Sequence, residues 1–137
     1  MRPFTELHTS VYKPFLRQLL KQAANRKMKR VASMAPFEAC YDSSTIHRSG
    51  VPSIHLELQE GVTWTIHETN LMVKTKHNVV CLGFVDGGTR PTKSLAKASI
   101  VIGGHQLEDN LLVFDFDSSK LSFSPSLLLQ NTSCSHF

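Results

Sequence analysis

The segment spanning residues 99–125 constrains the fold more than any other part of this sequence. A short apolar run closes on the pair Gly103-Gly104, and two further segments, 110–116 and 120–125, alternate between apolar and polar residues. A short Ser-Ser turn separates the two alternating segments. Alternation with a period of two, interrupted by a short polar turn, is typical of a β-hairpin. The end of the chain therefore predicts short strands rather than helices.

The middle of the chain continues the same pattern. Residues 53–58 alternate in polarity, which predicts a strand with Ile54, Leu56 and Leu58 facing inward. Residues 37–53 are rich in serine, glycine and proline, and we expect them to form a loop. The remaining predicted strands are 62–67, 70–74, 78–84 and 100–104. With about seven strands and one helix, the chain is predicted to be mostly β.

The one predicted helix lies within residues 9–30. The apolar residues that fall at helical spacing predict the buried face, and they are Val11, Phe15, Leu19, Leu20, Ala23 and Ala24. Either Thr9 or the serine after it is the predicted N-cap. Because proline is tolerated only in the first helical turn, Pro14 places the start of the helix close to residue 10.

The charge of the chain is uneven. The 137 residues carry a net charge of +4, and residues 8–37 contain seven lysines and arginines but no acidic residue. This segment predicts either a solvated helix face or a non-specific surface for polyanions. Aromatic side chains are not interleaved with the cations, so we expect no nucleic-acid partner. No apolar run is long enough to span a membrane, and we expect no membrane partner.

Motifs for metal, cofactor or nucleophilic chemistry are not evident. The seven histidines lack the spacing of metal-binding motifs, although His55 and His67 could face each other on neighbouring strands. We predict no metal and no cofactor. Asp115 and Asp117 have strand spacing and could form a carboxylate pair, but aspartates that lead into a hairpin turn are the commoner explanation.

The sequence has three cysteines, Cys40, Cys81 and Cys134. An odd number leaves one thiol without a partner inside the chain. Asn131-Thr132-Ser133 matches the acceptor sequence for N-glycosylation, which matters only in a secreted protein. The first residues lack the apolar core of a signal peptide, so the sequence taken alone does not predict secretion.

Several long stretches resemble one protein family. They are PFTELHTSVYKPF, RVASMAPFEACYDSS, VPSIHLELQEGVTWTIHETNLMV, NVVCLGFVDGG and SIVIGGHQLEDNLLVFDFDSSKLSFSPSLL. Together they resemble the C-terminal lobe of plant pepsin-like aspartic proteases, in the subgroup of xylanase inhibitors, basic 7S globulins and extracellular dermal glycoproteins. The resemblance implies that residues 1–137 form the second lobe of a pepsin-like β-barrel fold, with one amphipathic helix near the N-terminus and without the first lobe.

The resemblance also bears on catalysis. Pepsin-like enzymes take one aspartate from each lobe, and Thr5-Glu6-Leu7 and Tyr12 match positions that follow the second-lobe motif. The aspartate is therefore expected just upstream of Met1. We predict a non-catalytic, protein-binding module with no catalytic residue of its own. The alternative is that the chain is part of an aspartic endopeptidase whose catalytic residues lie upstream.

The resemblance assigns roles to the cysteines and to four further residues. It implies a disulfide between Cys40 and Cys81, and it implies that Cys134 pairs with a cysteine of the missing lobe. Family members are secreted to the cell exterior, which makes glycosylation of Asn131 relevant. The structural family motif comprises Gly83, Gly103, Gly104 and Asp115.

The resemblance further implies protein partners. These are the missing N-terminal lobe or a microbial cell-wall hydrolase such as a xylanase. The chain departs from the family pattern in a longer loop at residues 89–99. An isolated lobe is also expected to expose an apolar interface and to associate.

Overall fold

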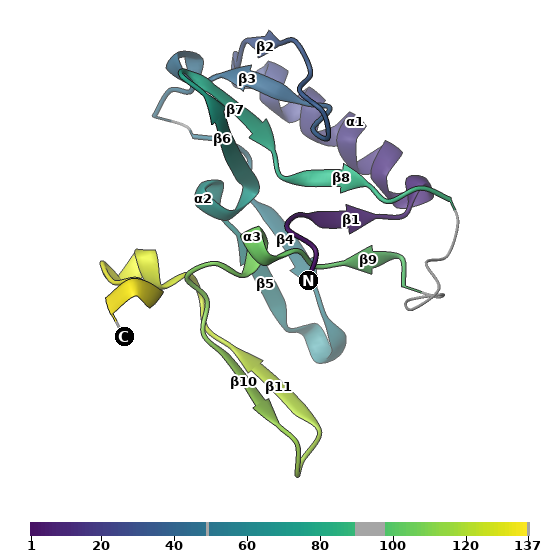
Figure 1. Cartoon of the computed structure of the whole chain (residues 1–137), viewed down its shortest axis with the longest axis vertical. Helices are drawn as coiled ribbons and strands as arrows, with labels where there is room; N and C mark the ends of the chain where they lie inside the picture. The colour runs from purple at the N-terminus through teal and green to yellow at the C-terminus, as the bar shows by residue number, and fades with distance from the viewer. Residues whose placement is uncertain (49, 90–97, 137) are drawn as a thin grey trace.

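The structure of the protein is a computed structural model that describes residues 1–48, 50–89 and 98–136. The predicted long loop at 89–99 falls largely on residues 90–97, which lie outside the described residues. Figure 1 shows a body of short twisted strands with one long helix, from which two β-hairpins project. The strands of the described residues form four small sheets, which confirms the mostly β fold class.

A three-stranded sheet holds the N-terminal segment in place. Strand β1 (Thr5–Leu7) lies between β8 (Phe84–Asp86), to which it is parallel, and β9 (Ile100–Val101), to which it is antiparallel. Residues from the start, middle and end of the chain thus meet in one sheet. No strand is predicted at β1 from the sequence, because three residues are too few to show a period of two.

A four-stranded antiparallel sheet has the order β2-β3-β7-β6. The prediction that residues 37–53 form only a loop is wrong at β3, where Cys40 and Tyr41 are buried and pair with Cys81 and Val80 of β7. Tertiary pairing overrides the polar composition of the flanking residues. The bounds are β2 (Arg30–Val31), β3 (Cys40–Asp42), β6 (Met72–Lys76) and β7 (Val79–Leu82).

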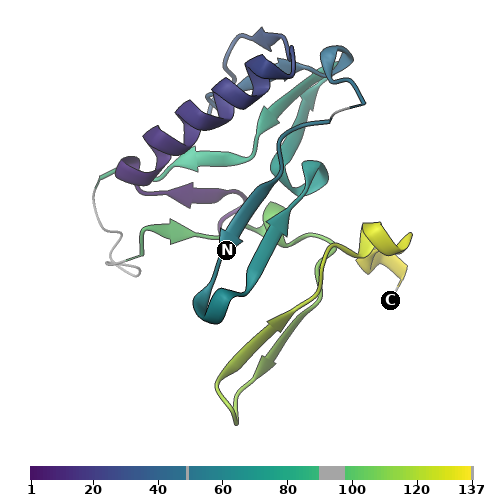
Figure 2. The same ribbon diagram turned by 180° about the vertical axis from the view of Figure 1, so that it is seen from behind.

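The two projecting hairpins are β4–β5 and β10–β11, and both lie at the end of the molecule away from the long helix (Figures 1 and 2). Leu58 was predicted to face inward, but it lies beyond the end of β4 and is 42% exposed. The bounds are β4 (Ile54–Glu57), β5 (Thr63–Ile66), β10 (Leu112–Asp115) and β11 (Lys120–Phe123).

Helix α1 (Thr9–Asn25) confirms the predicted helix and ends five residues earlier than the predicted segment. Its N-cap is His8, whose Nδ1 accepts a hydrogen bond from Ser10 N, so the predicted caps Thr9 and Ser10 are one or two residues too late. An imidazole nitrogen here takes the place of the usual cap oxygen. The helix starts one residue before the predicted residue 10, but Pro14 is its sixth residue and lies inside the helix rather than in the first turn.

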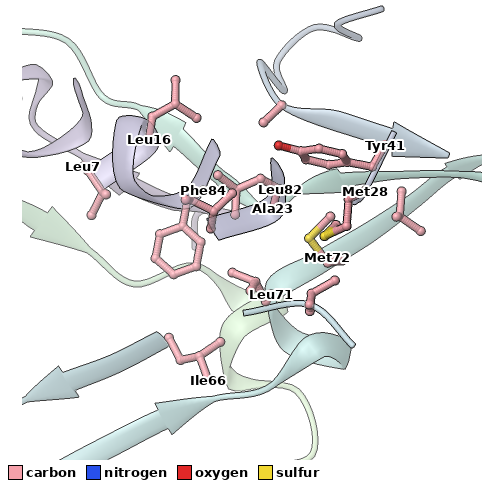
Figure 3. Close-up of a cluster of buried hydrophobic side chains, with 14 of the residues drawn as sticks. Leu7, Leu16, Ala23, Met28, Tyr41, Ile66, Leu71, Met72, Leu82 and Phe84 are labelled. Atoms are coloured by element: carbon pink, nitrogen blue, oxygen red, sulfur yellow. The ribbon is translucent and has the colours of Figure 1, made fainter. Parts of the chain in front are cut away.

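The buried face of α1 agrees with the prediction only in part. Leu19 and Ala23 are buried as predicted, whereas Val11 and Phe15 are only half-buried. Tyr12 and Leu16 are buried as well, although they were not predicted to be. Figure 3 shows Leu16 and Ala23 in the same apolar cluster as Leu82 and Phe84. Tyr12 joins the core because its ring contributes a large apolar area, although its hydroxyl group hides it from a count of apolar residues.

Short helical segments complete the fold. Helix α2 (Glu68–Leu71) precedes β6, and α3 (Gly104–Leu107) follows the paired glycines. The C-terminal region contains two 3-10 turns, at Leu127–Gln130 and Cys134–His136. None of the helices in the described residues is long and apolar enough to cross a membrane.

Candidate functional site

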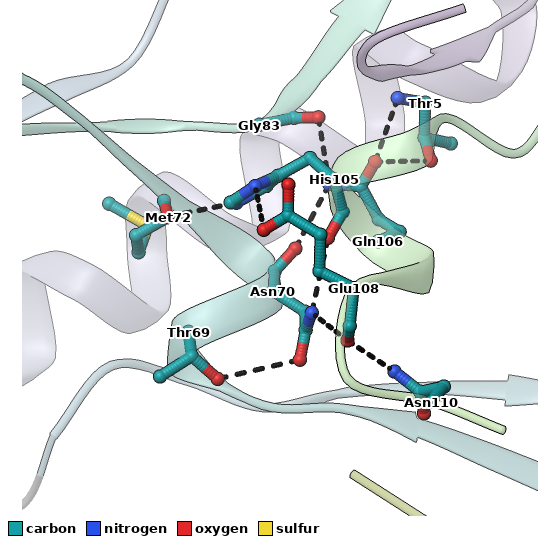
Figure 4. A network of polar contacts seen from close by, with 9 residues as sticks. All are labelled: Thr5, Thr69, Asn70, Met72, Gly83, His105, Gln106, Glu108 and Asn110. Carbon is teal, nitrogen blue, oxygen red and sulfur yellow. Dashed lines mark hydrogen bonds and ion pairs between the residues drawn. The ribbon is translucent and has the colours of Figure 1, made fainter. Parts of the chain in front are cut away.

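The best-organised polar cluster of the described residues surrounds Gln106 on α3. Its side chain is completely buried, and its carboxamide lies between β1, α2 and the start of β8 (Figure 4). Oε1 accepts hydrogen bonds from Thr5 N at 2.9 Å and from Thr5 Oγ1 at 2.7 Å. Nε2 donates to the carbonyls of Asn70 and Gly83, both at 3.0 Å. All four hydrogen-bonding positions of the amide are therefore used. We call Gln106, Thr5 and Asn70 the polar clamp.

Asn70 extends the polar clamp toward the second half of α3. Its Nδ2 donates to the carbonyl of His105 at 3.1 Å and to that of Glu108 at 2.8 Å. The His105 ring makes its own contacts on either side, through Nε2 to the Met72 carbonyl at 3.1 Å and through Nδ1 to the Glu108 carboxylate at 3.3 Å. The C-terminal part of the chain is thus fixed to α2 and β6 by polar contacts rather than by apolar packing alone.

The glycines of the predicted family motif make room for the polar clamp. At Gly83, an added Cβ would lie 3.0 Å from Gln106 Nε2 and 3.1 Å from the Leu71 carbonyl oxygen. At Gly103, an added Cβ would overlap the backbone of Phe4. Gly103 N donates to Thr5 Oγ1 at 3.0 Å, so the close approach also completes the hydrogen bonds of Thr5. Gly104, by contrast, has ordinary space around it.

Asp115, the fourth predicted motif residue, lies at the end of β10 and shapes the hairpin turn. Its carboxylate accepts hydrogen bonds from the Ser118 hydroxyl and from the backbone N–H groups of Ser118 and Asp117. The Ser118 side chain is the main cause of a lowered pKa at Asp115. The hydrogen bonds support the structural interpretation of Asp115 and Asp117 over the carboxylate-pair interpretation.

The cysteines lie in two different environments. Cys40 and Cys81 are directly opposite each other on β3 and β7 and form the predicted disulfide. Cys134 is free and exposed, and its backbone N–H donates to Asp109 Oδ1 at 2.9 Å. Asn131 is exposed and has a left-handed backbone conformation, with φ at 54°. Its glycosylation stays a prediction, as does pairing of Cys134 outside the chain.

The histidines do not come together. His55 is opposite Thr65 rather than His67, and its Nδ1 lies 2.9 Å from Thr65 Oγ1. Within the ranges that the structure describes, no three histidine, cysteine or acidic side chains are placed to hold a metal ion.

An apolar groove separates the two projecting hairpins. It has a volume of about 430 Å³. Each hairpin contributes a cross-strand apolar pair, Leu56 with Trp64 from β4–β5 and Phe114 with Leu121 from β10–β11. At the base of the groove the Trp64 and Phe123 rings are 5.9 Å apart. We call this feature the hairpin groove.

The β10–β11 side of the hairpin groove is strongly exposed. Phe114 is 60% exposed and Leu121 is 55% exposed, and both line the groove, whereas Phe116, which is 88% exposed, lies outside its lining. Contiguous apolar surface of this kind marks an interaction site in soluble proteins. Strands β10 and β11 are predicted from the sequence, but the groove is not. The groove depends on how the two hairpins are placed relative to each other, and the sequence pattern of either hairpin alone does not show this placement.

Comparison with known proteins gives the family. Residues 1–125 match the family described as xylanase inhibitor C-terminal. The chain belongs to this family. The match confirms the resemblance on which the sequence analysis relied.

Individual relatives agree with the family assignment. The chain is 46% identical over its whole length to probable aspartic proteinase GIP2 of Nicotiana benthamiana. It is 43% identical, over 98% of its length, to gamma conglutin 1 of Prunus dulcis. It covers 31% of either relative, so it spans about a third of the length of the curated relatives.

Solved structures confirm the fold. The crystal structure of EDGP superposes with a TM-score of 0.86 at 49% identity, over 98% of this chain and 32% of that chain. Basic 7S globulin from soybean superposes with a TM-score of 0.80 at 35% identity, over 96% of this chain and 34% of that chain. The chain therefore has the fold of a pepsin-like C-terminal lobe.

Proposed function

We propose that residues 1–137 form one non-catalytic pepsin-like lobe that acts by binding protein through the hairpin groove. The observation that carries the proposal is the exposed apolar surface of β10–β11, where Phe114 and Leu121 line the groove and are each more than half exposed. The polar clamp supports a structural rather than a catalytic role for the buried polar residues, because the Gln106 amide has no hydrogen-bonding position left for a substrate.

We propose first that the N-terminal lobe of the two-lobe pepsin-like architecture occupies the hairpin groove. The curated relatives are about three times as long as this chain, so the matching lobe in each relative is part of a longer polypeptide. An interface between lobes is expected to bury apolar surface of the kind that the groove exposes. In the same arrangement, Cys134 would pair with a cysteine of the other lobe.

A second candidate partner is a microbial cell-wall hydrolase such as a xylanase. The family description, xylanase inhibitor C-terminal, supports it. Addition of the recombinant chain in large excess to a fungal xylanase tests the idea, and an unchanged hydrolysis rate would exclude it. The aspartic endopeptidase alternative has less support, since relatives of this chain include gamma conglutins and a basic 7S globulin.

The proposed location is the cell exterior. The Cys40–Cys81 disulfide supports it, because disulfides form and persist in oxidising compartments. Glycosylation at the exposed Asn131 would accompany this location.

Light scattering tests whether the hairpin groove mediates association. The recombinant chain is expected to self-associate, and the variant Phe114→Ser/Leu121→Ser, which removes two exposed side chains that line the groove, is expected to do so much less. The matched control, Leu128→Ser/Leu129→Ser, removes two exposed apolar side chains that do not line the groove and should associate like the wild type. A monodisperse wild-type monomer, or equal loss of association in both variants, would contradict the proposal.

The mass of the natural polypeptide tests whether an N-terminal lobe accompanies this lobe. An antibody against the C-terminal segment SFSPSLLLQNTSC would isolate the protein, and its mass would be measured before and after reduction and deglycosylation. A much larger species is expected if a first lobe accompanies this one. A species near 15.3 kDa would exclude a covalent first lobe and direct the search to separate partners.

A further inference from the structure

The solvent-facing side of α1 carries a row of positive charge. Lys13, Arg17 and Lys21 follow one another at intervals of four residues, and all three are exposed. Four residues of α-helix advance about 6 Å along the axis, so the three side chains form a line about 12 Å long. We call these three residues the α1 cation row.

The α1 cation row has few anions to neutralise it. Residues 8–37 contain no aspartate or glutamate. The ion pairs of the described residues join Arg2 to Glu6 and His105 to Glu108, and so involve no member of the row. Lys13 lies near enough to Asp86 to help lower the pKa of that carboxyl, whose main cause is the hydrogen bond from Thr9. Like charges that remain this close to one another attract a polyanion from solution.

Several exposed side chains beside the row are neutral and polar. Gln18, Gln22 and Asn25 are exposed on the same helix and offer both donors and acceptors of hydrogen bonds. Amides of this kind suit the hydroxyl groups of sugars. The two aromatic residues of the helix do not extend this surface, because Tyr12 is buried and the Phe15 ring packs 5.2 Å from the ring of Phe84. The row therefore lacks the exposed rings on which single-stranded nucleic acids stack, and it lacks an apolar wedge for a lipid surface.

We propose that the α1 cation row binds an extended acidic polysaccharide, a sugar chain that carries carboxylate groups along its length. Carboxylates on successive parts of the polymer would face Lys13, Arg17 and Lys21, while sugar hydroxyls would contact the neighbouring amides. The row is distinct from the protein-binding surface, because both views of the molecule place α1 at the end away from the hairpin tips (Figures 1 and 2). The two surfaces can therefore be occupied at the same time.

Affinity electrophoresis in gels that contain polygalacturonate tests the proposal. The full chain would be compared with the variant Lys13→Gln/Arg17→Gln/Lys21→Gln. The matched control is Lys74→Gln/Lys76→Gln/Lys120→Gln, which removes three exposed cations from other elements. Both variants change the net charge from +4 to +1 (4 − 3 = 1), so they differ only in where the charge is lost. If association obscures migration, all three proteins would carry Phe114→Ser/Leu121→Ser.

The α1 variant is expected to bind about tenfold more weakly, or worse, and its affinity should depend less on salt than that of the wild type. The control variant should bind within about twofold of the wild type. Equal losses in both variants would overturn the proposal, because binding would then follow net charge alone. Tighter binding to duplex DNA or to phosphatidylserine vesicles than to polygalacturonate, at the same ionic strength, would also overturn it.

Discussion

Thr5 and Gln106 are joined by two hydrogen bonds to a single atom, although 101 residues separate them in the chain. Both the backbone N–H and the hydroxyl of Thr5 donate to Gln106 Oε1. Because the same amide also donates to Asn70 and Gly83, one side chain ties the N-terminal strand to the middle and the end of the sequence. The polar clamp therefore fixes four separate segments of the chain relative to one another.

Replacement of Gln106 by leucine is expected to destabilise the protein by about 3 kcal/mol or more. A leucine fills similar space but leaves the buried Thr5 N–H and the carbonyls of Asn70 and Gly83 without partners, at about 1–3 kcal/mol for each unsatisfied group. Urea denaturation measures the change. The exposed Gln18→Leu on α1 is the control, expected within about 0.5 kcal/mol of the wild type. Similar stability of the two variants would show that the clamp contributes little.

The adjacent glycines 103 and 104 are expected to respond differently to alanine. In Gly103→Ala the new Cβ would overlap the Phe4 backbone, which cannot move without distorting the entry to β1, so a loss of about 3 kcal/mol is expected. In Gly104→Ala the nearest side-chain atom is Met1 Sδ at 3.4 Å, and alanine favours the first turn of α3. Thermal unfolding of both variants would measure the difference. Equal midpoints would disprove the close packing at Gly103.

Removal of the disulfide in Cys40→Ala/Cys81→Ala is expected to lower the free energy of unfolding by about 4 kcal/mol. The two cysteines are 41 residues apart, and the estimate is the chain entropy that a loop of this length restores to the unfolded state. Denaturation with and without a reducing agent provides the measurement, since the reducing agent should affect the wild type alone. Cys134→Ser is the control and should unfold like the wild type, because Cys134 is free and exposed.

Asp86 is expected to make the fold sensitive to acid. Its pKa is lowered from the ordinary value of 3.8, chiefly because the Thr9 hydroxyl donates to Asp86 Oδ1 at 2.6 Å. A carboxylate with a lowered pKa stabilises the folded state above its unfolded pKa, and that stabilisation is lost as the pH falls through the folded pKa. The window for this loss runs from about pH 4 downward.

The variant Asp86→Asn should therefore be less stable than the wild type at neutral pH, and the difference between them should shrink below about pH 4. Melting temperatures measured from pH 7 to about pH 2 test this. Asp117→Asn, which changes an exposed aspartate of the β10–β11 turn, should give a profile parallel to the wild type. A constant difference between Asp86→Asn and the wild type across the range would rule out the role of Asp86.

The sequence by itself determined the local elements with strong patterns. The helix at α1 and the hairpin β10–β11 both followed from side-chain periodicity, since each is built from contacts between residues close in the chain. Long stretches such as SIVIGGHQLEDN also identified the family. The family resemblance in turn predicted the Cys40–Cys81 disulfide, a pairing that the spacing of the three cysteines does not reveal.

Tertiary structure alone decided the features that join distant segments. Strand β1 exists because β8 and β9 flank it, and β3 exists because β7 pairs with it, so neither needs a strong pattern of its own. Gln106 is buried because Thr5, Asn70 and Gly83 satisfy its amide from three other elements. A polar side chain in the sequence gives no sign of such partners, because they are supplied only when the chain has folded.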